Sequence, residues 1–182
     1  MRRRPVESIV PETFNALAEA RGWSNRCSPV AQLRDRFLID LLAVWQGLAQ
    51  GAIPPRRAFT ARALKPFLRD IAIFEQVARQ PPRYRARLVG TGLAAITGDL
   101  QGAIIDEKLP PDITARWHAS LDAVLRAGAP LRFTVANVAF GGLSHLQAEL
   151  LAAPMTDDAG AATMVLAGIV LERTQNPVPL KP

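Results

Sequence analysis

The stretch that most constrains the fold is 83–112, where a strand-like segment leads through a Gly-Thr-Gly turn into a very short helix. Arginines alternate with apolar residues over 83–89, a pattern typical of a strand with one exposed face. The turn occupies 90–92, and Gly98 ends the next helix after about two turns. A parallel crossover needs a longer connection, so the stretch favours antiparallel pairing. Three side chains are expected on the inner face of the strand: Tyr84, Ala86 and Leu88.

Four other segments have the composition of strands. They are 70–79, 131–140, 143–153 and 163–172. A longer helix is expected between Pro110 and Gly128, which are good start and stop residues. Helices clustered between two and three strands predict an α+β fold, a five-stranded antiparallel sheet covered on one face by short helices.

An amphipathic helix is predicted over 29–53. Its apolar residues recur at intervals of three and four and form one broad stripe, which must pack on the domain or on a second copy. We expect a homodimer through this helix. The candidate interface residues are Phe37, Leu38, Leu41, Leu42, Trp45 and Leu48. The remaining divisions are a flexible basic arm over 1–28, a folded domain over 54–173 and a disordered tail over 174–182.

Composition limits the classes of function. Cys27 is the single cysteine, which rules out an intrachain disulfide and a Cys-rich metal site. The net charge is +6, and the excess of Lys and Arg lies in the first half of the chain. A basic half can attract nucleic acid, although it can equally be a solvated surface. The candidate nucleic-acid contacts are Arg2, Arg3, Arg4, Arg56, Arg57, Arg62 and Lys65. Without a signal-peptide-like or membrane-spanning apolar run, we expect a cytoplasmic protein.

The order of elements, together with three motifs, resembles a PAS domain. More narrowly, it is similar to a bacterial group of short, single-domain PAS-like proteins common in alphaproteobacteria. That group has a leading LLxxWxxL helix, an RYRxxLVGT strand and turn, and a G-D/R-x-x-G element. The matching segments here are 41–45, 83–91 and 98–102. The resemblance covers about 30–171.

The resemblance implies a pocket between sheet and helices, and a module that senses a small ligand or contacts a partner protein. It implies no defined cofactor, and no catalytic constellation is evident, so we expect a non-enzymatic sensor. Ligand or partner binding would act through helix or dimer packing on an unidentified signalling protein. The candidate pocket residues are Phe74, Leu88, Leu93, Ile96, Trp117, Leu121, Phe133 and Asn137. Asn137 falls in register with the inner residues of its strand, so its amide is expected to face the pocket.

Other readings of single motifs remain open. The segment 90–95 matches the G-x-G-x-x-A nucleotide fingerprint, but its helix is too short, and a strand-to-helix corner with close backbone approach explains the glycines. His118 is a candidate axial ligand for a haem-based gas sensor; the alternative is a surface histidine paired with Asp122. Glu149 is expected to face water or a partner, together with Gln147.

Overall fold

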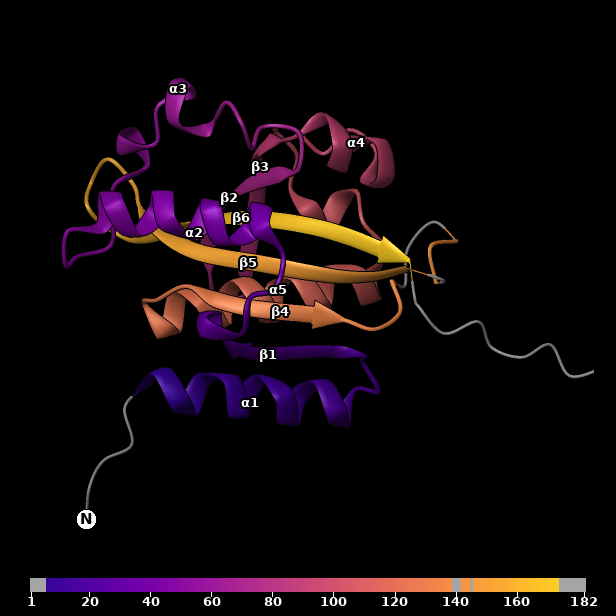
Figure 1. The fold of residues 1–182 in the computed structure, drawn as a ribbon. Helices are drawn as coiled ribbons and strands as arrows, with labels where there is room; N and C mark the ends of the chain where they lie inside the picture. The colour runs from indigo at the N-terminus through magenta and orange to yellow at the C-terminus, as the bar shows by residue number, and fades with distance from the viewer. Residues whose placement is uncertain (1–5, 139–141, 145, 174–182) are drawn as a thin grey trace, which may run out of the picture.

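The computed structural model describes residues 6–138, 142–144 and 146–173. Its centre is one antiparallel sheet of six strands in the order β1-β4-β5-β6-β2-β3 (Figure 1). The strands are β1 Asn25–Pro29, β2 Ile71–Arg79, β3 Pro82–Val89, β4 Leu131–Val135, β5 Leu146–Thr156 and β6 Ala162–Arg173. The α-helices are α1 Val6–Ala20, α2 Arg36–Ala49, α3 Ala61–Leu64, α4 Thr91–Thr97 and α5 Pro111–Ala127. Three short 3-10 turns are η1 Val30–Gln32, η2 Arg56–Ala58 and η3 Ile105–Glu107.

The predicted α+β class and antiparallel sheet are confirmed, with six strands in place of five because 25–29 adds a strand beside β4. The strand predicted over 131–140 ends at Val135, and residues 139 and 140 lie outside the described residues. The tail predicted over 174–182 also lies outside them.

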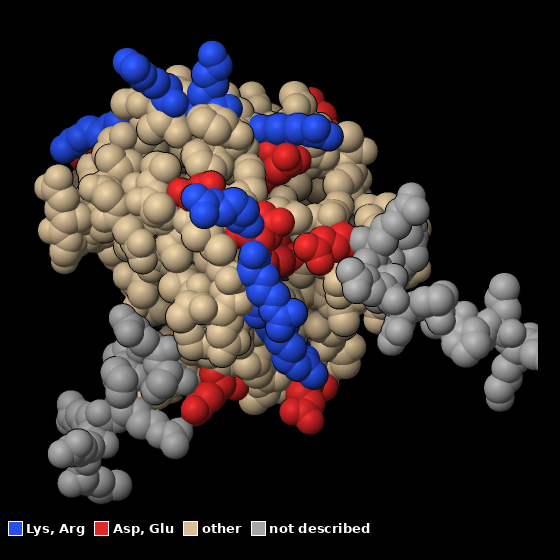
Figure 2. All heavy atoms as spheres, viewed as in Figure 1, with Lys and Arg blue, Asp and Glu red and all other residues tan. Residues whose placement is uncertain are grey.

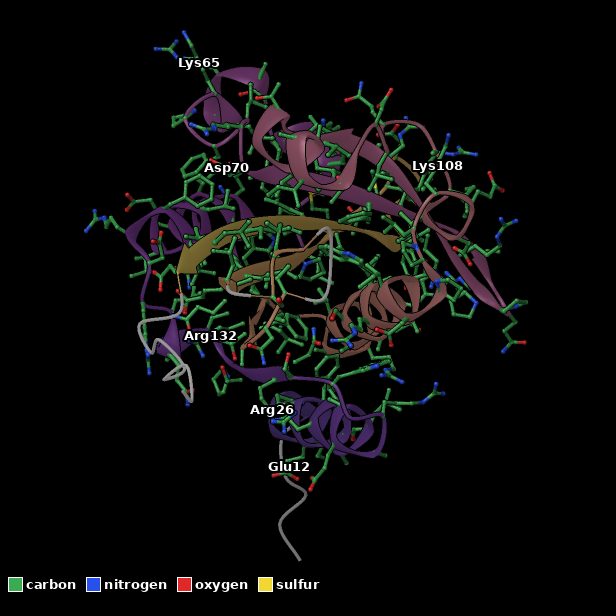
Figure 3. The ribbon with its side chains drawn as sticks, turned by 90° about the vertical axis from the view of Figure 1, so that its right-hand side faces the viewer. Glu12, Arg26, Lys65, Asp70, Lys108 and Arg132 are labelled. Carbon is green, nitrogen blue, oxygen red and sulfur yellow. The ribbon has the colours of Figure 1, made fainter. Side chains whose placement is uncertain are left out.

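The short helices between β3 and β4 cover one face of the sheet, as predicted, and the N-terminal amphipathic helix α2 covers the other face together with α3. Figure 3, an end-on view, shows α2 and α5 on opposite sides of the strands. One core cluster joins α1, α4 and α5 to the sheet, and the other joins α2 and α3 to the opposite face. Along β2 the side chains alternate accordingly: Phe74 belongs to the first cluster and Ile73 to the second.

Helix α2 buries its apolar stripe within its own chain. The Asp35 carboxylate caps it by accepting from the Phe37 N–H at 2.8 Å, and Leu38 and Leu41 are fully buried. The Trp45 indole N–H donates to the Pro154 carbonyl of β5 at 2.8 Å.

The expected dimer stripe is therefore already covered by the sheet. Of its residues, Leu38, Leu41, Leu42 and Trp45 are buried, and Phe37 and Leu48 pack at the edge of the same cluster. The four buried residues are therefore not available to a dimer interface, because periodicity gives the width of an apolar face and not what covers it. The homodimer itself stays a prediction. The helix also starts at Arg36, since the preceding residues form η1 and an extended turn.

The first segment is folded where the structure describes it, which corrects the expected flexible arm. Phe14 of α1 packs edge-on against Phe133 of β4, with ring centroids 5.0 Å apart. The Asn15 amide binds both backbone groups of Cys27 on the outer edge of β1: it accepts from the N–H at 2.7 Å and donates to the carbonyl at 2.9 Å. At Cys27 this side chain thus satisfies the two backbone groups that a neighbouring strand would otherwise bind.

The Gly-Thr-Gly turn packs closely against the segment 68–70, at Gly90 against backbone and at Gly92 against the Asp70 side chain. A Cβ at Gly90 would lie 2.2 Å from the carbonyl oxygen of Arg69, and one at Gly92 would lie 2.2 Å from Asp70 Oδ1. These contacts account for both glycines without a bound phosphate. The turn therefore fits the corner interpretation of the motif.

A β-bulge changes the side of the sheet to which the later side chains of β3 point. Ile73 pairs with Leu88 and Phe74 with Ala86, so Arg87 is an extra residue between the two pairs. Leu88 consequently packs with the α2 cluster, whereas Tyr84 and Ala86 face α5 as expected. The simple alternation predicted for 83–89 is wrong at Leu88.

Candidate ligand-binding cavity

A cavity of about 130 Å³ lies between α4, α5 and the sheet. Its floor comes from the inner faces of β4, β5 and β6, and its roof from one side of α4 and α5. Apolar side chains make most of the wall: Leu93, Ile96, Ile113, Trp117, Phe133, Val135, Val138, Ala148, Leu150, Ile169 and Leu171. The polar lining residues are Asn25, Thr97, Arg116 and Ser120. A small, largely apolar molecule matches such a wall.

The structure brings half of the predicted pocket residues to this cavity. They are Leu93, Ile96, Trp117 and Phe133. Phe74 lines a neighbouring void of about 20 Å³, where its ring lies 5.0 Å from that of Trp117. Leu121 is fully buried in the adjoining core and lines neither space.

Two predicted pocket residues lie elsewhere. Leu88 faces α2 because of the bulge. Asn137 is exposed and lies beyond the end of β4, where its backbone N–H and carbonyl meet the Ser24 hydroxyl at 3.4 and 3.3 Å. The inward register predicted for Asn137 fails because the strand ends at Val135, two residues before it.

One end of the cavity is polar, and the first 33 residues supply part of it. The Arg116 guanidinium donates to the Asn25 side-chain oxygen at 3.0 Å and pairs with Asp112 at 2.8 Å. The Trp23 indole N–H donates to the other oxygen of Asp112 at 3.1 Å, and its ring lies 5.6 Å from the Arg116 guanidinium carbon. Sequence reasoning missed Asn25 because its segment was read as an arm.

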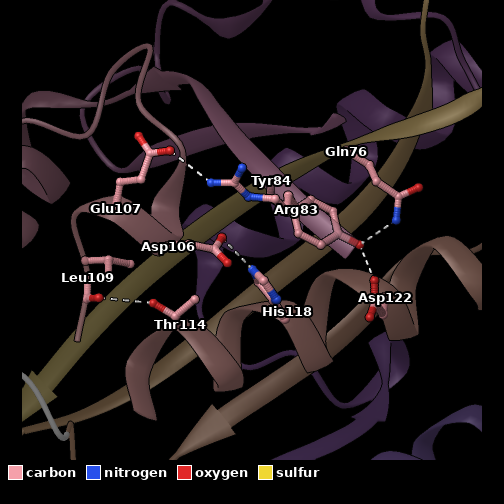
Figure 4. A network of polar contacts seen from close by, with 9 residues as sticks. All are labelled: Gln76, Arg83, Tyr84, Asp106, Glu107, Leu109, Thr114, His118 and Asp122. Carbon is pink, nitrogen blue, oxygen red and sulfur yellow. Dashed lines mark hydrogen bonds and ion pairs between the residues drawn. The ribbon is translucent and has the colours of Figure 1, made fainter. Parts of the chain in front are cut away.

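A second polar group links α5 to β3 and η3 (Figure 4). The buried Tyr84 hydroxyl donates to Asp122 and accepts from the Gln76 amide at 3.1 Å. Burial raises the pKa of Tyr84, and the bond to Asp122 raises it further. His118 lies 3.0 Å from Asp106.

These contacts correct the expected partner of His118, which is Asp106 and not Asp122. His118 also lines neither cavity, and its Nε2 is directed to a carboxylate (Figure 4). The geometry thus gives no support to His118 as a haem ligand.

On the opposite face of the sheet, Glu149 and Arg132 form a buried ion pair with both side chains about 10% exposed. Arg132 Nε donates to Glu149 at 2.5 Å. The same carboxylate accepts from the backbone N–H groups of Arg34 at 3.2 Å and Asp35 at 2.9 Å. The expectation that Glu149 faces water is wrong, because the turn leading into α2 covers it.

The basic residues do not form one continuous surface on the face shown in Figure 2, where acidic side chains lie among them. Arg57, Arg62 and Lys65 are exposed, whereas Arg56 donates to the Phe59 carbonyl of its own turn at 3.1 Å. Arg2, Arg3 and Arg4 lie outside the described residues.

The described residues contain neither a candidate metal site nor a candidate membrane span. No group of three or more His, Cys, Asp and Glu residues there could hold a metal ion. Over the same part of the chain, no helix combines the length and the apolar character that crossing a bilayer requires.

The antiparallel sheet, the helices on its two faces and the cavity under α4 and α5 define an α+β fold with an internal cavity. The PAS domain family matches residues 34–170, so the chain belongs to the PAS domain family. This confirms the resemblance carried by the sequence motifs. No curated protein matches the chain. Among solved structures it is similar to the "Structure of an RNA-binding Light-Oxygen-Voltage Receptor", with 15% identity and a TM-score of 0.43. That match covers 81% of this chain and 38% of the receptor chain.

Proposed function

We propose that this PAS domain is a non-enzymatic sensory or regulatory module that binds a small, largely apolar ligand in the cavity under α4 and α5. The observation that carries the proposal is the apolar cavity of about 130 Å³. An engineered apolar cavity of about 150 Å³ in another protein stays dry and binds benzene or xenon. The ligand class is therefore a compact ring or branched chain of similar size.

Ligand binding in the cavity would be transmitted to α1 through its packing on the sheet. Phe133 lines the cavity and packs edge-on against Phe14 of α1. A ligand that moves Phe133 changes this contact and shifts the packing of α1 on the sheet. Such a shift between two packings is a common form of switching, and an unidentified partner protein would read it.

Benzene, titrated into the ¹⁵N-labelled protein and followed by NMR, tests the proposal. We expect saturable shifts in the amides of α4, α5 and the facing strands, together with smaller shifts in α1. Ala148→Phe fills the cavity and should abolish them, because Ala148 lines its floor. Ala43→Phe, at an exposed position of α2 on the other face, is the matched control and should bind as the wild type does. Absence of saturation in the wild type, or equal binding by Ala148→Phe, would refute the proposal.

A further inference from the structure

The cavity is lined by a buried side-chain amide whose NH₂ group has no hydrogen-bond acceptor among the described residues. Asn25 is 7% exposed and lines the cavity. Its side-chain oxygen accepts from Arg116 Nη1 at 3.0 Å, which fixes the orientation of the amide. Among the described residues its NH₂ group has no acceptor. This unpaired donor on an otherwise largely apolar wall is placed to meet a polar atom that the cavity receives.

The other short polar side chains of the cavity are already satisfied as donors. The Ser120 hydroxyl donates to the Arg116 carbonyl at 3.0 Å, and the Thr97 hydroxyl donates to the Leu93 carbonyl at 3.0 Å. Both bonds are internal to their helices. Among the short polar side chains of the cavity, the donor left to meet a ligand is thus the amide of Asn25.

The charge balance of the polar end favours an uncharged ligand. The Arg116 guanidinium is paired with Asp112 at 2.8 Å, so its charge is already matched. No acidic side chain lines the cavity within the described residues. An ion placed against these apolar walls would be desolvated without a free counter-charge.

We propose, resting on the proposed function, that the cavity selects an uncharged small molecule with a hydrogen-bond acceptor oxygen, such as a ketone, ester or ether, and that the Asn25 NH₂ group donates to that oxygen. Arg116 acts as a positioning residue because it occupies the amide oxygen and leaves only the donor side for the ligand. Asn25 lies outside the family match at 34–170, so this selectivity belongs to the part of the chain that precedes it.

The test compares two probes of the same shape, cyclopentanone and methylenecyclopentane, in the wild type, Asn25→Leu and Asn25→Asp. Asn25→Leu removes the amide while keeping a similar size. Asn25→Asp keeps an acceptor for Arg116, removes the donor and adds a carboxylate charge beside that guanidinium, so it guards against a folding failure of the leucine variant. The readouts are the dissociation constants by NMR titration and the ¹³C shift of the bound ketone carbonyl.

We expect the ratio of ketone to hydrocarbon affinity to fall about threefold to tenfold in both variants, which is the range for one net hydrogen bond. The carbonyl ¹³C signal should move upfield from its hydrogen-bonded position, a change that loss of shape alone does not produce. If both probes bind and the ratio is unchanged, because the Trp117 N–H or a retained water meets the oxygen, this inference is overturned while the proposed function stands. If neither probe binds the wild type, both are overturned.

Discussion

The buried ion pair on the α2 face offers the sharpest test of how this fold is held together. Glu149 links β5 to Arg132 of β4 and to the backbone of Arg34 and Asp35, which lead into α2. Removing its charge in Glu149→Gln leaves the Arg132 guanidinium buried without a counter-charge. Breaking a buried pair from one side typically costs about 3–5 kcal/mol.

Since both side chains are about 10% exposed, solvent screens the pair little and the full range applies. With a urea dependence of about 2 kcal/mol per M, a loss of 3 kcal/mol lowers the unfolding midpoint by about 1.5 M. Equilibrium urea unfolding, followed by far-UV circular dichroism, measures this shift. The same assay on Arg132→Met and on the double variant completes a double-mutant cycle.

The double variant should lose less free energy of unfolding than the sum of the two single losses, because it leaves no unmatched charge. Asp40→Asn, which breaks the exposed i,i+4 pair with Arg36, is the control and should leave the midpoint unchanged. A wild-type midpoint in Glu149→Gln, or losses that add in the double variant, would refute the reasoning.

Three further predictions follow from local contacts. Gly90→Ala should destabilise the protein by about 1–3 kcal/mol, because its Cβ would lie 2.2 Å from backbone oxygens. Gly47→Ala, in open space on α2, should stabilise the protein by about 0.5–1 kcal/mol. Urea midpoints that move in the same direction in the two variants would contradict this. Asn15→Ala should speed hydrogen exchange at the Cys27 amide and lower the free energy of unfolding by about 1–3 kcal/mol. Unchanged exchange would show that the Asn15 side chain does not protect the edge of β1. Burial raises the pKa of the Cys27 thiol from 9.0 to about 12, so a thiol reagent at pH 8 should label only unfolded protein. The stability that this group contributes below pH 9 should disappear as pH rises toward 12, because the unfolded chain loses the thiol proton first. Rapid labelling of the native protein would contradict the prediction.

Much of the fold could be predicted because the relevant signals are local. Alternation and turn residues located β2, β3, β5 and β6, and Pro110 with Gly128 bounded α5 closely. The same signals placed Leu93, Trp117 and Phe133 on inner faces, and the structure brings them together at the cavity.

What could not be predicted depends on contacts between distant segments. The bulge that turns Leu88 toward α2 arises from pairing with Ile73, which the sequence of β3 alone does not encode. Glu149 looks like a surface residue until the turn at Arg34 covers it. Asn25 sits in a short strand with a polar composition, and only its pairing with β4 makes it an inner-face residue.

The position of β1 has a practical consequence for anyone preparing this domain. A fragment trimmed to the family boundaries at 34–170 would lack the strand that pairs with β4, the Phe14 ring against Phe133 and the amide beside Arg116. It would leave β4 as an unpaired edge strand prone to self-association and would open the cavity on that side. Ligand screens should therefore start from protein that keeps residues 6–33.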